Sequence, residues 1–184
     1  KLIDFLKKSP QYVIPIYQRA YSWSEKECLQ LWDDIFRTGE NDRVNAHFIG
    51  SIVYVERGLY SVANQSQLLV IDGQQRLTTI TLLIEALSRA VGNEEPIEGF
   101  SAKKMRGYFL IDPLQEGENK YKLVLSQTDK NSLMTLIDQA PWPKDYSVRI
   151  KDNFELFERK IAESNDLKTI CQGIAKLIIV DISL

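Results

Sequence analysis

The sequence has few of the residues that build metal sites and disulfide frameworks. Of its 184 residues, two are cysteine and one is histidine. Cys28 and Cys171 are isolated and lack C-x-x-C spacing, which argues against a zinc site or a disulfide-stapled scaffold. Isolated thiols are typical of a reducing compartment, so we expect a cytoplasmic protein.

Long apolar runs and a dominant charge are also missing. The longest apolar stretches, such as residues 177–180, are far shorter than the roughly 20 residues that cross a bilayer. No charged-then-apolar signal segment opens the chain. With 25 acidic and 23 basic side chains, the formal net charge is -2. No global positive field indicates nucleic acid, so a surface that binds it would have to be a local patch.

Hydrophobic residues make up 44% of the chain and aromatic residues 10%, enough for the core of one ordinary domain. The chain starts without methionine and stops inside the apolar run at 176–184. We therefore expect residues 1–184 to be a single domain taken from a longer polypeptide, with its C-terminal end missing.

Hydrophobic periodicity predicts both helices and strands. Apolar residues at helical spacing predict helices over 24–37, 77–91, 128–140 and 150–161. Runs rich in β-branched residues predict strands over 47–56, 68–71, 120–125 and 176–184. Residues 57–67 are expected to turn the chain back, so that the strands on either side pair antiparallel.

Local signals place some of the boundaries. Ser24 and Glu27 have the spacing of a capping box at a helix start. Gly39 and Gly92 are expected to end the first and second long helices. Pro15 interrupts the aromatic, β-branched segment 11–23, which predicts an edge strand or a loop there.

The stretch LLVIDGQQRLTTITLLIEAL, residues 68–87, places a polar cluster between an apolar strand and an apolar helix. The first N–H groups of a helix lack partners within it, so a helix start approached through a glycine turn attracts anions. Gly73 lets a ligand come close to the backbone. Arg76, in the first turn, opposes the helix dipole by roughly 0.3–1 kcal/mol, a penalty that an anionic ligand would remove.

The side chains around this turn match a phosphate site that is not of the P-loop type, because no G-x-x-x-x-G-K-[ST] motif occurs. Asp72 could act as helix N-cap, as a magnesium ligand, or as the group that orients a water molecule. Gln74 and Gln75 offer donors and acceptors, and Thr78 and Thr79 add hydroxyls. A capped turn with solvent-facing glutamines explains the same residues without a ligand.

A second cluster interleaves aromatic rings with one planar cation in the segment IPIYQRAYSW. Its members are Tyr17, Gln18, Arg19, Tyr21 and Trp23. Such a set can stack a base, clamp a phosphate or pack the edge of a core, and taken alone core packing is favoured. His47 could be a ligand or a base, although a single histidine is more often a structural donor.

The order and spacing of IPIYQRAYSW, HFIGSIVYVE and LLVIDGQQRLTTITLLIEAL closely resemble the N-terminal domain of GmrSD-type restriction endonucleases. KLVLSQTDKNSLMTLI and the terminal LIIVDISL are also similar to that family, so the resemblance spans most of the chain. These are modification-dependent systems that defend bacteria against phage with altered DNA.

The resemblance implies an α+β fold related to the ParB and sulfiredoxin nucleotide-binding domains, with a small mixed sheet and DGQQR at a strand-to-helix junction. It also implies binding and hydrolysis of a nucleoside triphosphate, GTP or UTP, with magnesium. The residues implied as catalytic are Asp72, Gln74, Gln75 and Arg76. Those expected to bind the nucleotide are Arg19, Gly73 and Arg76, with the hydroxyls of Thr78 and Thr79 beside them. Asp72 is expected to hold magnesium or to position the attacking water.

The same resemblance implies that modified DNA is a partner and that an HNH-type nuclease domain lies further along this chain or in a second one. Tyr17, Gln18, Arg19, Tyr21 and Trp23 are the implied sensor of the modification. A module that reads modified DNA without turning over a nucleotide remains an alternative, as does a purely structural scaffold. Because His47 is the sole histidine, no HNH site is present, and we expect no DNA cleavage by these residues alone.

Overall fold

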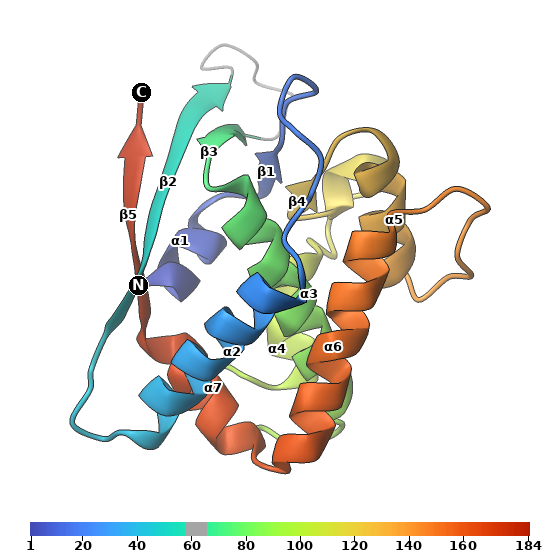
Figure 1. Cartoon of the computed structure of the whole chain (residues 1–184). Helices are drawn as coiled ribbons and strands as arrows, with labels where there is room; N and C mark the ends of the chain where they lie inside the picture. Colours follow the sequence, from blue (N-terminus) through green and yellow to red (C-terminus); the bar gives the residue numbers. More distant parts are fainter. Residues whose placement is uncertain (58–65) are drawn as a thin grey trace.

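The computed structural model describes residues 1–57 and 66–184 and is built around a five-stranded mixed sheet (Figure 1). The strands are β1 (Gln11–Val13), β2 (His47–Arg57), β3 (Gln67–Asp72), β4 (Leu123–Val124) and β5 (Leu177–Ser183), in the order β4-β1-β3-β2-β5. β1 is parallel to β3 and β4, whereas β2 is antiparallel to β3 and parallel to β5. The α+β class and the antiparallel pair are confirmed. Most of the expected turn, residues 58–65, lies outside the described part of the chain.

The helices cover one face of this sheet and carry most of the core. They are α1 (Leu2–Lys8), α2 (Glu25–Glu40), α3 (Gln74–Ala90), α4 (Ala102–Met105), η1 (Arg106–Leu110), η2 (Gly117–Lys120), α5 (Gln127–Ile137), α6 (Val148–Ser164) and α7 (Leu167–Lys176). The four predicted helices are confirmed as α2, α3, α5 and α6. Figure 1 shows α3 running from the end of β3 into the middle of the helical layer, and it is buried over most of its length.

The two faces of the sheet differ in burial, as alternation along the strands requires. Side chains that face the helices are almost fully buried, among them Tyr12, Ile52, Tyr54, Leu68 and Val70. The opposite face is also apolar but partly or largely exposed, and carries Val53, Val55, Leu69, Ile71, Val180 and Ile182. The helical layer therefore holds the core. The DGQQR turn lies where this layer meets the end of β3.

The expectation that Gly39 ends the first long helix is wrong. α2 continues through Gly39 to Glu40 and is capped at Asn41. A Cβ at Gly39 would lie 2.0 Å from the carbonyl oxygen of Thr169, and one at Gly173 would lie 2.0 Å from that of Ile35. The two glycines let α2 and α7 cross in direct backbone contact. Gly39 is therefore required by a long-range contact, although a glycine at this place in the sequence also resembles a helix end.

The expectation of an edge strand near Pro15 is also wrong, because β1 lies between β4 and β3. Gln11 is only 1% exposed, and its amide donates to the carbonyl oxygens of Glu118 and Tyr121. Pro15 follows the strand and so leaves its ladder intact. The rest of the segment, residues 14–24, is a loop as predicted.

Replacing Gly39 by alanine is expected to destabilise the fold by about 3 kcal/mol, because overpacking against a backbone carbonyl cannot be relieved by a side-chain rotation. Gly107→Ala is the matched control, since a Cβ at Gly107 meets nothing within 4 Å. It should leave stability unchanged or raise it by up to about 1 kcal/mol. Urea unfolding of both variants checks this, and equal midpoints would contradict the assigned role of Gly39.

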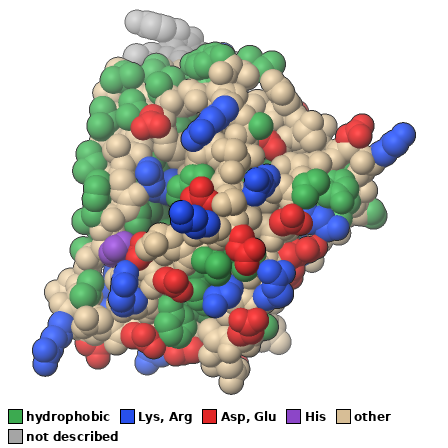
Figure 2. All heavy atoms as spheres, viewed as in Figure 1, with side chains coloured by type: hydrophobic (Ala, Val, Ile, Leu, Met, Phe, Trp, Pro, Cys, Tyr) green, Lys and Arg blue, Asp and Glu red, His purple; other side chains and the backbone are tan. Residues whose placement is uncertain are grey.

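The surface carries charges of both signs. Figure 2 shows acidic and basic side chains interspersed over the face that carries α2 and α6. Burial raises the pKa of the Cys28 thiol to about 11 and that of Cys171 to about 12, so both remain protonated at neutral pH. None of the described helices is long and apolar enough to cross a membrane.

Candidate functional site

The DGQQR motif forms the junction between β3 and α3. Asp72 is the exposed last residue of β3, and Gly73 takes the N-cap position with φ 94° and ψ 8°. Asp72 is therefore not the N-cap, which corrects one of its three expected roles. A Cβ at Gly73 would lie 2.9 Å from the carbonyl oxygen of Ser51, so β2 also requires a glycine here. No described side chain caps α3, which leaves its first N–H groups available to a ligand.

Gln75 holds the aromatic loop against the helix start. Its side chain is 7% exposed, and its Oε1 accepts from the backbone N–H groups of Ser22 at 2.8 Å and Trp23 at 3.3 Å. Its Nε2 donates to the carbonyl oxygen of Ala20 at 3.2 Å. The whole amide is thus used to fix residues 20–23, a positioning role.

Gln74 and Gln18 also connect the loop 14–24 to the junction between β3 and α3, at positions closer to solvent than Gln75. Gln74 Nε2 donates to the carbonyl oxygen of Arg19 at 3.1 Å, and Gln18 Nε2 donates to that of Ile71 at 2.9 Å. The two motifs found separately in the sequence are therefore one hydrogen-bonded unit.

Tyr21 fixes the loop 14–24 to the helices through its hydroxyl and its backbone N–H. Its hydroxyl lies 2.7 Å from Thr79 Oγ1 and accepts from Asn153 Nδ2 at 2.9 Å, while its backbone N–H donates to Asp129 at 2.7 Å. Burial raises the pKa of Tyr21, which stays a neutral phenol. Thr78 and Thr79 are buried at 2% and 0% exposure. The sequence pattern did not predict Asn153 or Asp129, whose only signal is a polar residue within an apolar helix face.

The tip of the loop projects into solvent. Ile16 and Tyr17 are 73% and 70% exposed, and Arg19 is exposed beside them. Of the five residues expected to sense DNA, Tyr17 and Arg19 reach the surface, whereas Tyr21 is buried. The tip is the part of this unit that a macromolecule could contact.

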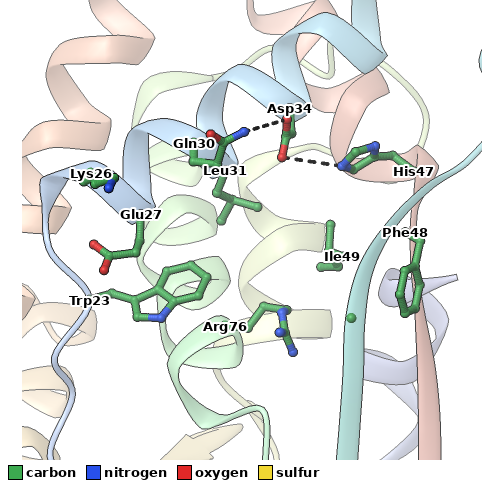
Figure 3. A pocket seen from close by; sticks show the side chains of 11 residues that line it. Trp23, Lys26, Glu27, Gln30, Leu31, Asp34, His47, Phe48, Ile49 and Arg76 are labelled. Atoms are coloured by element: carbon green, nitrogen blue, oxygen red, sulfur yellow. Dashed lines mark hydrogen bonds and ion pairs between the residues drawn. The ribbon is translucent and has the colours of Figure 1, made fainter.

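A cavity of about 510 Å³ opens beside the junction, between α2, the start of β2 and Arg76 (Figure 3). Its lining consists of Trp23, Lys26, Glu27, Gln30, Leu31, Asp34, His47, Phe48, Ile49, Gly50 and Arg76. Volumes of this order are usual for small-molecule sites. Two expected site residues, Trp23 and Arg76, line the cavity; Asp72, Gln74 and Arg19 lie outside its lining.

Arg76 reaches the cavity from the first turn of α3 by crossing a bulge in β2. Its Nη1 donates to the carbonyl oxygen of Ser51 at 2.9 Å. The guanidinium lies over Gly50, where a Cβ would be 2.6 Å from Cζ and where φ is +119°. Among the described residues no carboxylate pairs with Arg76. Its remaining N–H groups can therefore bind an anion bidentately.

The opposite part of the cavity is organised around Asp34 of α2 (Figure 3). Asp34 Oδ1 accepts from Arg37 at 2.6 Å and from Gln30 Nε2 at 3.2 Å. Its Oδ2 lies 3.6 Å from His47 Nε2. His47 is thus placed beside a carboxylate at the start of β2, in a cluster that sequence reasoning did not connect.

The described residues contain no group of three or more acidic, histidine or cysteine side chains that could hold a metal ion. This arrangement still fits magnesium carried by a nucleotide, because Mg²⁺ is usually held by one or two carboxylates together with substrate phosphates. Asp72 is the exposed carboxylate at the junction.

Comparison with known proteins gives this geometry a context. A family model described as "GmrSD restriction endonuclease, N-terminal domain" matches residues 2–183. The chain belongs to this family. A search of curated proteins found no match.

Membership in the GmrSD N-terminal family makes this chain a domain of a DNA-targeting restriction system that acts in defence against phage. The match covers nearly the whole chain, so the junction, the loop and the cavity all belong to the GmrSD domain. The relation to the ParB and sulfiredoxin fold stays a prediction.

Proposed function

We propose that the junction and the adjoining cavity bind a nucleoside triphosphate, GTP or UTP, with magnesium, and hydrolyse it. The observation that carries this proposal is the guanidinium of Arg76, which lines the cavity without a carboxylate partner in the described chain, at the uncapped start of α3. A cation held in the first turn of a helix is favourable when an anion binds there.

In this proposal each residue of the motif has a separate task. Arg76 binds the phosphates inside the cavity, and Arg19 contacts them from the loop. Asp72 holds the magnesium ion together with the phosphates or orients the attacking water. Gln74, which is half-buried, orients that water, and Gln75 keeps the loop in place.

The buried positions of Thr78 and Thr79 favour a supporting role beneath the turn rather than direct contact with phosphate. Thr79 supports Tyr21, and its hydroxyl donates to the carbonyl oxygen of Gln75 in the first turn. The expected nucleotide contacts of these two threonines thus have less structural support than those of Arg76.

A second candidate function is recognition of modified DNA without nucleotide turnover, supported by the exposed ring of Tyr17 beside Arg19. In the combined proposal this tip senses the DNA, and hydrolysis controls an HNH-type nuclease domain in the same chain or a partner. Tyr17→Ala should then weaken binding of modified DNA while nucleotide binding persists. Equal binding of modified and unmodified DNA by the native protein would refute the sensing role.

Hydrolysis is tested by phosphate release from GTP and UTP in the presence of magnesium. Asp72→Ala is expected to lower the rate on the order of 100-fold, the contribution typical of a group that positions or activates the nucleophile. Asp42→Ala, at an exposed acidic residue after α2, should leave the rate unchanged. If Asp72→Ala also leaves it unchanged, the catalytic assignment is wrong.

A further inference from the structure

The cavity is electrostatically divided along its length. Arg76 approaches from the start of α3, whereas Asp34 and His47 meet at the other side, where α2 faces the beginning of β2 (Figure 3). The Arg76 guanidinium attracts a triphosphate, because no described carboxylate neutralises it, whereas the charge of Asp34 is already balanced by Arg37 and offers a triphosphate nothing. We therefore expect a ligand with a phosphate end to place that end at Arg76 and its remainder toward Asp34.

Asp34 retains the capacity to accept a hydrogen bond. Its Oδ1 is occupied by Arg37 and Gln30, but its Oδ2 is 3.6 Å from His47 Nε2, longer than a hydrogen bond. A carboxylate oxygen is acceptor-only, so the matching group on a ligand is an N–H or an O–H. A nucleoside offers both, on its base and on its ribose.

The cavity wall between Arg76 and Asp34 is apolar and aromatic. Trp23 and Ile49 line it together with Leu31, which is 5% exposed and belongs to the core. Flat apolar surface next to an aromatic ring suits a planar base, because stacking needs no particular hydrogen-bond pattern. Gln30 adds an amide beside the carboxylate.

We propose that the nucleoside part of the bound nucleotide occupies this cavity against Trp23 and Leu31, with its hydrogen-bond donors directed to Asp34. This inference rests on the proposed function and goes further, since it separates a nucleoside-recognising residue on α2 from the phosphate-binding residue on α3. Asp34 then sets nucleotide affinity without contacting the phosphates.

The test compares GTP, UTP and inorganic tripolyphosphate, each with magnesium, by calorimetric titration of the full-length protein. Asp34→Ala should weaken GTP binding about tenfold or more, as expected for a lost hydrogen bond to a charged acceptor. Its tripolyphosphate affinity should remain that of the native protein. Asp33→Ala, an exposed neighbour on α2, is the matched control and should change neither affinity.

The 2′-deoxy and 3′-deoxy forms of GTP identify the donor. If the donor is a ribose hydroxyl, one deoxy form binds the native protein weakly and is insensitive to Asp34→Ala. If it is a base N–H, both forms keep their dependence on Asp34. Asp34→Asn preserves the side-chain volume, so a loss of affinity in this variant does not come from a packing defect. It should also weaken the binding of GTP but not that of tripolyphosphate.

Two results would overturn the inference while the proposed function stands. One is unchanged GTP affinity in both Asp34 variants; the other is an equal loss of GTP and tripolyphosphate affinity, which would mean that Asp34 acts on the phosphate site. If the native protein binds neither GTP nor UTP, the proposed function itself fails, and this inference fails with it.

Discussion

Arg76→Ala is expected to lower triphosphate affinity by on the order of 100-fold or more. The guanidinium lines the cavity without a carboxylate partner in the described chain, so its charge is available to the phosphates. Charge-assisted hydrogen bonds contribute about 1.5–3 kcal/mol each, and a bidentate contact supplies two of them. Calorimetric titration with GTP, and separately with tripolyphosphate, should show both affinities lost together.

The matched control is Arg159→Ala, which removes an exposed arginine of α6 far from the junction in sequence. It should leave binding unchanged. Arg76→Lys keeps the charge but loses the planar fork, so we expect an intermediate affinity. Circular dichroism should confirm that Arg76→Ala folds, because within the described part of the chain its side chain forms a single hydrogen bond, to Ser51. Native affinity in a folded Arg76→Ala variant would contradict the phosphate assignment.

A large effect on stability is also expected at Glu85, a fully buried carboxylate in the middle of α3. Arg89 Nε donates to it at 2.9 Å, and Arg106 Nη1 contacts it at 2.9 Å. The same arginines donate to the carbonyl oxygens of Leu136 and Ile137, so the cluster joins α3 to η1 and α5. Glu85→Ala removes the carboxylate that the two guanidinium groups share. It also leaves a cavity in the core.

Breaking a buried ion pair by removing one partner costs about 3–5 kcal/mol. Because the two arginines are 28% and 29% exposed and water can reach them, we expect the lower end of that range. Urea unfolding of Glu85→Ala measures the loss, and Glu163→Ala, an exposed glutamate on α6, is its control. A decrease in the free energy of unfolding of less than about 1 kcal/mol would show that this cluster does not hold α3, η1 and α5 together.

Sequence patterns could predict the long helices and the strands because these depend on local periodicity. The capping box at Ser24 and Glu27 and the positive φ of Gly92 after α3 are signals of this kind. Gly39 resembles a local helix-end signal but serves a contact with Thr169, which is distant in sequence. The inner position of β1 depends on β4, more than a hundred residues further along, so no local signal could reveal it.

The candidate site was predictable only in part for the same reason. The residues of the DGQQR turn stand out because they interrupt an apolar pattern, and Arg76 and Trp23 do line the cavity. Asp34 carries no such signal, because it is an ordinary polar residue on a helix surface, and His47 stands out only as the sole histidine. Only the packing of α2 against β2 brings them together.

The proposed function requires that a nucleoside triphosphate bind at the start of α3. Calorimetric titration of the full-length native protein with GTP and magnesium measures this binding. We predict saturable binding to one site per chain, competed by tripolyphosphate. Absence of saturable heat with GTP and with UTP, in a protein shown to be folded, would contradict the account and leave the junction as a structural turn.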